Sequence, residues 1–225
     1  AIDNGTQISA QALKDMFENT GGNGNGHFTF TSTKQLSNKT FSIDQQSFID
    51  MFDRAASASD SAIANVAAAN GIAGKLTRSN GKVILVDANG HEFTQELEKG
   101  LMGATLYNQI VNSYLTEEKV GAAVNNTDLV AGKNYTTMEH HFDEAFGYYA
   151  APVDFKSGYT GSESLRYWAS YSEELDATFP FIDRIMNSYK KGRAAIVAKN
   201  YTVKDAEVTK IHESLEILIA ASAIH

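Results

Sequence analysis

The scarcity of proline is the feature that most constrains what this chain can fold into. Its 225 residues contain two prolines, Pro152 and Pro180. Proline lacks a backbone N–H and clashes with the preceding turn, so its absence leaves long stretches free to be helical. Apolar residues recur with a helical period in several of these stretches. We therefore predict an all-α fold, a helical bundle with at most a short β-hairpin near Phe28 or Val83.

The longest helical pattern runs from about residue 92 to residue 115 and predicts a central helix. Gly100 and Gly103 lie within it, where we expect them to let a neighbouring helix approach closely. An alanine-rich stretch over residues 61–69 predicts a separate helix. Three apolar residues on one face of the central helix should be buried: Leu97, Leu101 and Ala104.

The length suits one hydrophobic core, so we expect a single helical domain over residues 1–225. The chain opens at Ala1 without an initiator Met, and its last helical pattern stops abruptly at His225. We therefore expect a chain that is trimmed at both ends.

The charge and composition exclude several classes of protein. A net charge of −8 argues against nucleic-acid binding, which needs clustered cations. The densest basic run, Lys190, Lys191 and Arg193, is expected at a helix end, where cations complement the helix dipole. The absence of cysteine excludes disulfides and thiolate metal sites. No apolar run reaches the roughly 20 residues that span a bilayer, so we expect no transmembrane segment.

The densest cluster of chemically useful side chains lies in the helical stretch 137–149. His141 and Glu144 are three residues apart and His140 and Glu144 four apart, so each pair can face one site. An imidazole and a carboxylate on successive turns are what a metal site in a helical bundle requires. The sequence thus offers His141, Glu144, His140 and, from the central helix, Glu96 as ligands for a divalent or ferric ion. A surface pair or a satisfied core histidine is the alternative interpretation.

A Glu144 side chain that points inward needs a cation, because burying an unpaired carboxylate is costly. A metal is one candidate, and Arg193 is the competing one. Glu216 is a second carboxylate that another helix might contribute to such a site. No zincin motif, nucleophile elbow or phosphate-binding loop is present in the sequence, so it favours a non-enzymatic role and leaves catalysis open.

Three strings resemble the signature stretches of a bacterial exported family, domain of unknown function 4856. They are Gly90 to Ala104, Thr137 to Tyr148 (TMEHHFDEAFGY) and Gly192 to Ile196 (GRAAI). The resemblance covers nearly the whole chain. It implies a helical protein that is exported, periplasmic or at the cell surface, and lipid-anchored through a segment that this chain does not contain.

A more distant likeness is to imelysin-type iron-regulated proteins, which carry a His-x-x-Glu motif in a helical bundle. His141-Phe-Asp-Glu144 matches that motif, but Glu139 stands where the glycine two residues before the histidine is usual. The first hypothesis is an exported binding protein for iron, another divalent cation or its chelate at the bacterial envelope. The alternative is a non-catalytic accessory subunit that docks on an envelope protein partner.

Overall fold

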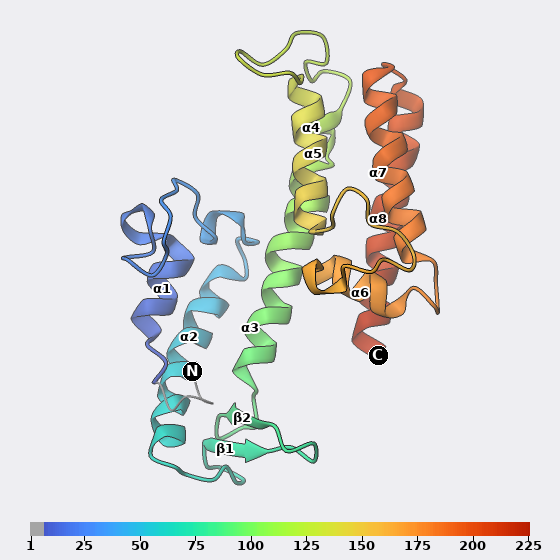
Figure 1. The fold of residues 1–225 in the computed structure, drawn as a ribbon. Helices are drawn as coiled ribbons and strands as arrows, with labels where there is room; N and C mark the ends of the chain where they lie inside the picture. The colour runs from blue at the N-terminus through green and yellow to red at the C-terminus, as the bar shows by residue number, and fades with distance from the viewer. Residues whose placement is uncertain (1–6) are drawn as a thin grey trace. The chain divides into compact units, whose positions relative to one another are not determined.

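A computed structural model of the chain describes residues 7–225 (Figure 1). More than half of these described residues are helical, and their strands form one antiparallel hairpin, so the predicted all-α fold is confirmed. The chain divides into two compact units, Ala1–Thr105 and Leu106–His225. The single domain expected over residues 1–225 stays a prediction. The expectation about the start at Ala1 concerns residues outside those described.

The first unit begins with a capped helix. In α1 (Ala10–Glu18) the Ser9 hydroxyl accepts a hydrogen bond from the Ala12 N–H, and Asn19 ends the helix in a left-handed conformation. Two short 3₁₀ turns, η2 (Thr20–Gly22) and η3 (Ser37–Lys39), lead into α2 (Gln45–Ile63). The strands β1 (Gly74–Thr77) and β2 (Val83–Val86) and helix α3 (Phe93–Leu101) follow.

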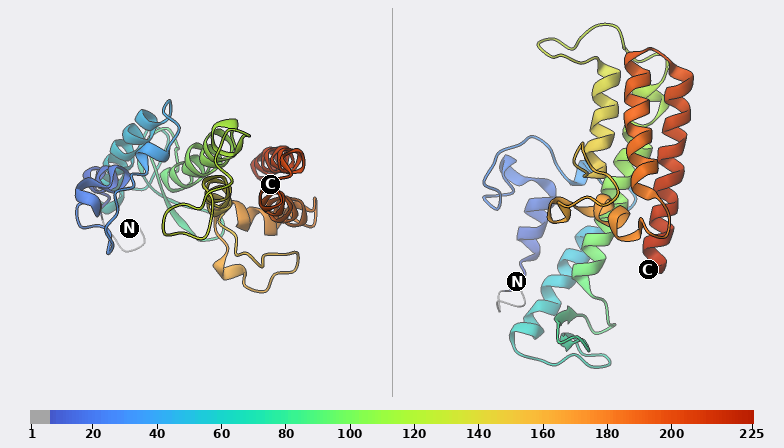
Figure 2. Two further views of the ribbon diagram at one scale, coloured as in Figure 1. Left: turned by 90° about the horizontal axis from the view of Figure 1, so that it is seen from above. Right: turned by 45° about the vertical axis from the view of Figure 1, so that its right-hand side comes forward.

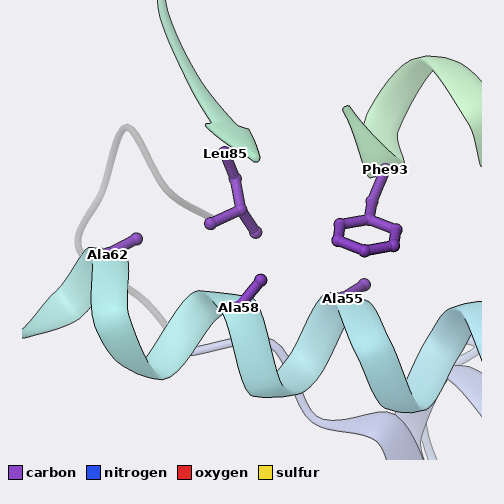
Figure 3. Close-up of a cluster of buried hydrophobic side chains, with 5 residues drawn as sticks. All are labelled: Ala55, Ala58, Ala62, Leu85 and Phe93. Carbon is purple, nitrogen blue, oxygen red and sulfur yellow. The ribbon is translucent and has the colours of Figure 1, made fainter. Parts of the chain in front are cut away.

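Small residues on α2 make room for the hairpin and for α3. Leu85 of β2 and Phe93 of α3 both point at the alanine face of α2 (Figure 3). Burial of these side chains stabilises the contact by roughly 1.5–3 kcal/mol for each large one. The members of this cluster are Ala55, Ala58, Ala62, Leu85 and Phe93. A second cluster joins α1 to α2 through Phe17, Phe48 and Phe52.

The hairpin pairs Gly74 with Val86 and Thr77 with Val83, so the predicted short β element is the one near Val83. The residues around Phe28 form turns and bends instead. The separate helix expected over residues 61–69 is wrong. Its first residues are the end of α2, and the chain then turns at Asn65, which adopts a positive φ of 65°. Beyond this turn the Ala68 N–H donates a hydrogen bond to the Lys75 carbonyl at 2.8 Å, next to the bridge that pairs Ala67 with Lys75.

The pattern predicted as one long helix starts as an α-helix and changes its winding. After α3 come two π-helical segments, η4 (Met102–Tyr107) and η5 (Ile110–Tyr114). The three apolar residues expected to be buried are half-buried and pack against the core of the first unit. A Cβ on Gly100 would lie 3.1 Å from the Phe48 ring, but a Cβ on Gly103 would meet open space. Close approach therefore concerns Gly100, and the expectation for Gly103 is wrong.

The second unit is a set of packed helices. It contains η5, the short α4 (Glu117–Val120), α5 (Thr137–Tyr149), the 3₁₀ turn η6 (Ser162–Ser164), α6 (Tyr167–Leu175), α7 (Phe181–Val197) and α8 (Tyr201–Ile224). Among the described residues, no helix is both long and apolar enough to cross a bilayer.

Helices α7 and α8 form a hairpin and lie side by side in each view (Figures 1 and 2). The turn between them is a Schellman motif: the Asn200 N–H donates to the Ala195 carbonyl at 2.8 Å, and the Lys199 N–H to the Ile196 carbonyl at 3.0 Å. Lys199 has the left-handed φ of 55° that this motif requires. The Asn200 side chain then caps α8 by accepting from the Val203 N–H. The three residues of this turn, 198–200, thus end α7 and cap the start of α8.

Candidate functional site

Three of the four predicted metal ligands lie on α5, each half-buried. His140 Nε2 is 3.6 Å from Glu144 Oε2, so the i,i+4 pair does meet across one turn. The His140 ring also stacks on Tyr135, with centroids 4.8 Å apart. His141 is used differently: its Nδ1 is 2.8 Å from the Lys119 carbonyl oxygen, a geometry in which the ring N–H donates. The structure therefore pairs Glu144 with His140 rather than with His141.

Glu144 receives a hydrogen bond from the Tyr114 hydroxyl at 3.2 Å. Burial, and next the Glu144 charge, raise the pKa of Tyr114 above its ordinary value, so the phenol remains a donor. The expected pairing of Glu144 with Arg193 is wrong. Arg193 reaches α5 from α7, but its guanidinium contacts Glu139 Oε1 at 2.7 Å and Asp143 Oδ1 at 2.9 Å.

The fourth candidate, Glu96, lies on α3 in the first unit, where it is 3.5 Å from His91 Nδ1. Glu216 is exposed on α8, next to the partly buried His212. Within residues 7–225, no three His, Asp or Glu side chains gather closely enough to hold a metal ion. The metal site stays a prediction, and the pair that the structure brings together for it is His140 and Glu144.

The Arg193 contacts also secure the start of α5. Glu139 completes a capping box with Thr136: its carboxylate accepts from the Thr136 N–H at 2.7 Å, and the Thr136 hydroxyl accepts from the Glu139 N–H at 3.3 Å. Burial alone would raise the pKa of Glu139. The hydrogen bonds from Thr136 and Arg193 outweigh burial and hold this pKa below its ordinary value. Glu139 is therefore ionised and structural, and its spacing from Thr136 is that of a capping box.

An aromatic contact holds α5 against α7. The Tyr189 ring of α7 meets Phe142 and Phe146 of α5 edge to face, at centroid distances of 5.7 and 5.2 Å. Gly192 makes this approach possible, because a Cβ there would lie 2.6 Å from Phe142 Cζ. The Tyr189 hydroxyl donates to the Ala145 carbonyl at 3.3 Å, so the buried phenol is satisfied internally.

Beside this contact the surface is hollowed into a groove of about 430 Å³, which we call the α5–α7 groove. Its base is buried and apolar, and its mouth carries two exposed valines, Val153 (78% exposed) and Val197 (63%). Three charged residues, Asp143, Lys190 and Arg193, stand around the apolar part. The apolar lining consists of Phe142, Phe146, Val153, Met186, Tyr189, Ala194 and Val197.

The charges around the groove are unevenly paired. Arg193 is neutralised by two carboxylates, one of them the Asp143 that also lines the groove. Lys190 is exposed and forms no ion pair with any residue in the described part of the chain. The groove therefore combines an apolar base with one uncompensated positive charge.

A second hollow of about 580 Å³ lies between α7 and α8 and is polar. Four of its charges form ion pairs within the protein: Glu207 is buried and pairs with Lys210 at 2.7 Å, and Arg184 lies 3.8 Å from Glu213. Burial would raise the pKa of Glu207, but hydrogen bonds from Lys210 and Ser188 hold it below its ordinary value. This hollow is less suited to an apolar ligand than the α5–α7 groove, because its lining is mainly polar and four of its charged side chains already pair with one another.

Sequence reasoning did not find the α5–α7 groove. A signal for it exists, since Phe142, Phe146 and Tyr149 follow the i, i+4, i+7 spacing of one helical face. Nothing in this spacing shows that the facing helix would leave part of the surface uncovered.

Comparison with known proteins gives a family and no closer relative. No curated protein and no solved structure matches the chain. The family model described as Domain of unknown function (DUF4856) matches residues 11–225. That match spans both compact units and agrees with the resemblance carried by the three sequence strings. The chain belongs to the DUF4856 family.

Proposed function

We propose that this protein is a non-catalytic binding protein of the bacterial envelope and that the α5–α7 groove is its binding site. The observation that carries the proposal is the groove itself: about 430 Å³, concave and mainly apolar. Ligand pockets in proteins are typically hollows of about 300–1,000 Å³ lined by hydrophobic and aromatic side chains, with a few polar groups at the edge. The groove meets this description. The placement at the envelope, with export and a lipid anchor, follows the resemblance of the chain to exported bacterial proteins.

A binding role also agrees with the state of the polar side chains nearby. The Tyr189 hydroxyl, Arg193 and Glu139 all have partners within the protein. A catalytic acid or base must be able to reach the group on which it acts. Apart from Lys190, the polar groups closest to the groove are occupied in holding α5 to α7, so they suit a scaffold better than a reaction.

The experiment is titration with an environment-sensitive apolar dye, followed by fluorescence. Ala194 lines the groove and is exposed on α7, so Ala194→Trp should fill the hollow without disturbing the core. We expect this variant to weaken dye binding about tenfold or more. The matched control is Ala206→Trp, an exposed alanine on α8 that lines neither hollow. Equal binding by both variants would contradict the assignment of the groove.

Metal binding is a second candidate, favoured by the 3.6 Å separation of His140 Nε2 and Glu144 Oε2. Imidazole and carboxylate suit divalent first-row metals, and ligands from outside the chain or a chelating molecule would have to complete the coordination. Titration calorimetry of untagged protein with Zn²⁺ and Fe²⁺ tests it. A His140→Ala, Glu144→Gln double variant should lose binding, whereas Glu118→Gln, an exposed carboxylate, should not. Unchanged affinity in the double variant would exclude this pair.

A further inference from the structure

We propose that the α5–α7 groove takes an amphipathic anion, a hydrocarbon chain that ends in a carboxylate, with Lys190 as the counter-ion. This inference rests on the proposed binding function and names its ligand class. It starts from the densest basic run of an acidic chain, Lys190, Lys191 and Arg193. The sequence predicts that this run lies at a helix end. In the structure α7 continues to Val197 and has no basic residue in its last turn, so the expectation is wrong.

The run is instead divided between two faces of α7. Lys190 and Arg193 are three residues apart, which places them on one face, and both line the α5–α7 groove. Lys191 lines the polar hollow between α7 and α8. Two of the three cations therefore lie at the α5–α7 groove, and none lies in the last turn of α7, where the helix dipole would favour it.

One cation at the groove lacks an ion pair, and this number indicates that the ligand carries one negative group. Arg193 already holds Glu139 and Asp143, at 2.7 and 2.9 Å. Lys190 remains without an ion pair among residues 7–225. A cation beside an apolar surface is complemented by an anion whose remaining surface is apolar. A single carboxylate satisfies this condition, whereas a doubly charged head group would exceed the charge available.

The base of the groove specifies the rest of the molecule. Phe142, Met186 and Tyr189 are buried, and the one hydroxyl among them is already bonded to the Ala145 carbonyl. The base thus offers no free donor to a polar ligand, while contact with hydrocarbon removes apolar surface from water. Met186 is unbranched and flexible, so it can adapt its shape to a hydrocarbon chain.

The test compares three probes with the same twelve-carbon chain: dodecanoate, neutral dodecyl maltoside and cationic dodecyltrimethylammonium, each kept below its micelle concentration. Affinities are measured by displacement of the apolar dye from the full chain. We expect dodecanoate to bind about three- to tenfold more tightly than the neutral probe, as for one charge-assisted contact at a partly exposed site. Lys190→Gln should remove this preference and leave the neutral affinity unchanged. Lys191→Gln is the matched control and should retain it.

The outcomes separate the two proposals. Equal affinity for all three probes, or a preference that survives Lys190→Gln, would overturn the anionic ligand and leave the groove as an apolar site. Failure of every probe to displace the dye, or insensitivity to Ala194→Trp, would overturn the proposed function itself. A protein that ignores dodecanoate monomers but sediments with anionic phospholipid vesicles would show that the surface recognises a membrane, and would also overturn this inference.

Discussion

The contact between Gly192 and Phe142 allows the sharpest test of how α5 packs on α7. A Cβ added at Gly192 would lie 2.6 Å from Phe142 Cζ and 3.2 Å from a second ring carbon. The ring is buried with 1% exposure, so it has little room to move aside. Overpacking of this kind costs typically 1–3 kcal/mol. The Gly192→Ala change should also gain about 1 kcal/mol in helix propensity, leaving a net loss of stability of up to about 2 kcal/mol.

The same substitution at Gly147 is the control. Gly147 lies within α5, is exposed, and an added Cβ there meets no atom within 4 Å. Gly147→Ala should therefore show the propensity gain alone, roughly 0.5–1 kcal/mol of stabilisation. The two variants should differ by about 1–3 kcal/mol. Urea unfolding followed by circular dichroism measures this, since a 2 kcal/mol difference moves the midpoint by about 1 M when the slope is about 2 kcal/mol/M.

Two results would refute the reasoning. One is a Gly192→Ala protein that unfolds at the same urea concentration as Gly147→Ala, or at a higher one. The other is an equal or greater cost of Phe142→Leu, which removes the ring edge, in the Gly192→Ala background than in the unaltered protein. If the clash is real, Phe142→Leu should cost less stability in the Gly192→Ala background than in the unaltered protein.

Three further perturbations follow from the ionisable groups. Burial opposes the ionised form of Asp87, but the Arg54 contact and two backbone N–H groups lower its pKa from 3.8 to about 2. Its ionised form thus contributes about 2 kcal/mol to the free energy of unfolding above pH 3.8, and this contribution is lost as the pH falls through about 2. Asp87→Asn should therefore reduce the loss of stability at acid pH, measured by unfolding curves over a series of pH values. Arg193→Met should destabilise the fold by about 1 kcal/mol by thermal unfolding at pH 7, because the ionised Glu139 loses its cation. Lys204 is 2% exposed and donates to the Val120 carbonyl, so Lys204→Met should cost about 1–3 kcal/mol, and a neutral thermal shift would contradict this.

The parts of the fold that could be predicted are those that depend on neighbours in the sequence. The capping box at Thr136 and the apolar face of α5 are local patterns, and both are present in the structure. The helix expected over residues 61–69 was wrong because pairing with Lys75, a residue outside the stretch, overrode the high helix propensity of alanine. The π-helical winding of η4 could not be predicted either, because a pattern read at 3.6 residues per turn contains no mark of i→i+5 bonding.

In the candidate site, too, contacts within one helix could be predicted and contacts between helices could not. Spacing alone correctly predicted that His140 and Glu144 could meet, since both lie on one helix. The choice of Arg193 between Glu144 and Asp143 depends on how two helices are rotated against each other. Adjacent positions on a helix differ by about 100° in direction. A rotation that sequence does not specify was therefore enough to exchange one carboxylate partner for the other.

The three-residue turn between α7 and α8 has a consequence for the order of folding. Its hydrogen bonds join residues three to five apart, and local contacts form with a small loss of chain entropy. By contrast, the Asn126 side chain must reach the Ile196 carbonyl across 70 residues to tie the chain before α5 to α7. We therefore expect the α7–α8 hairpin to assemble early and α5 to dock on it late. The two sides of the α5–α7 groove would then come together in the last steps of folding. Ligand binding by the groove would therefore measure completed folding and not helix content.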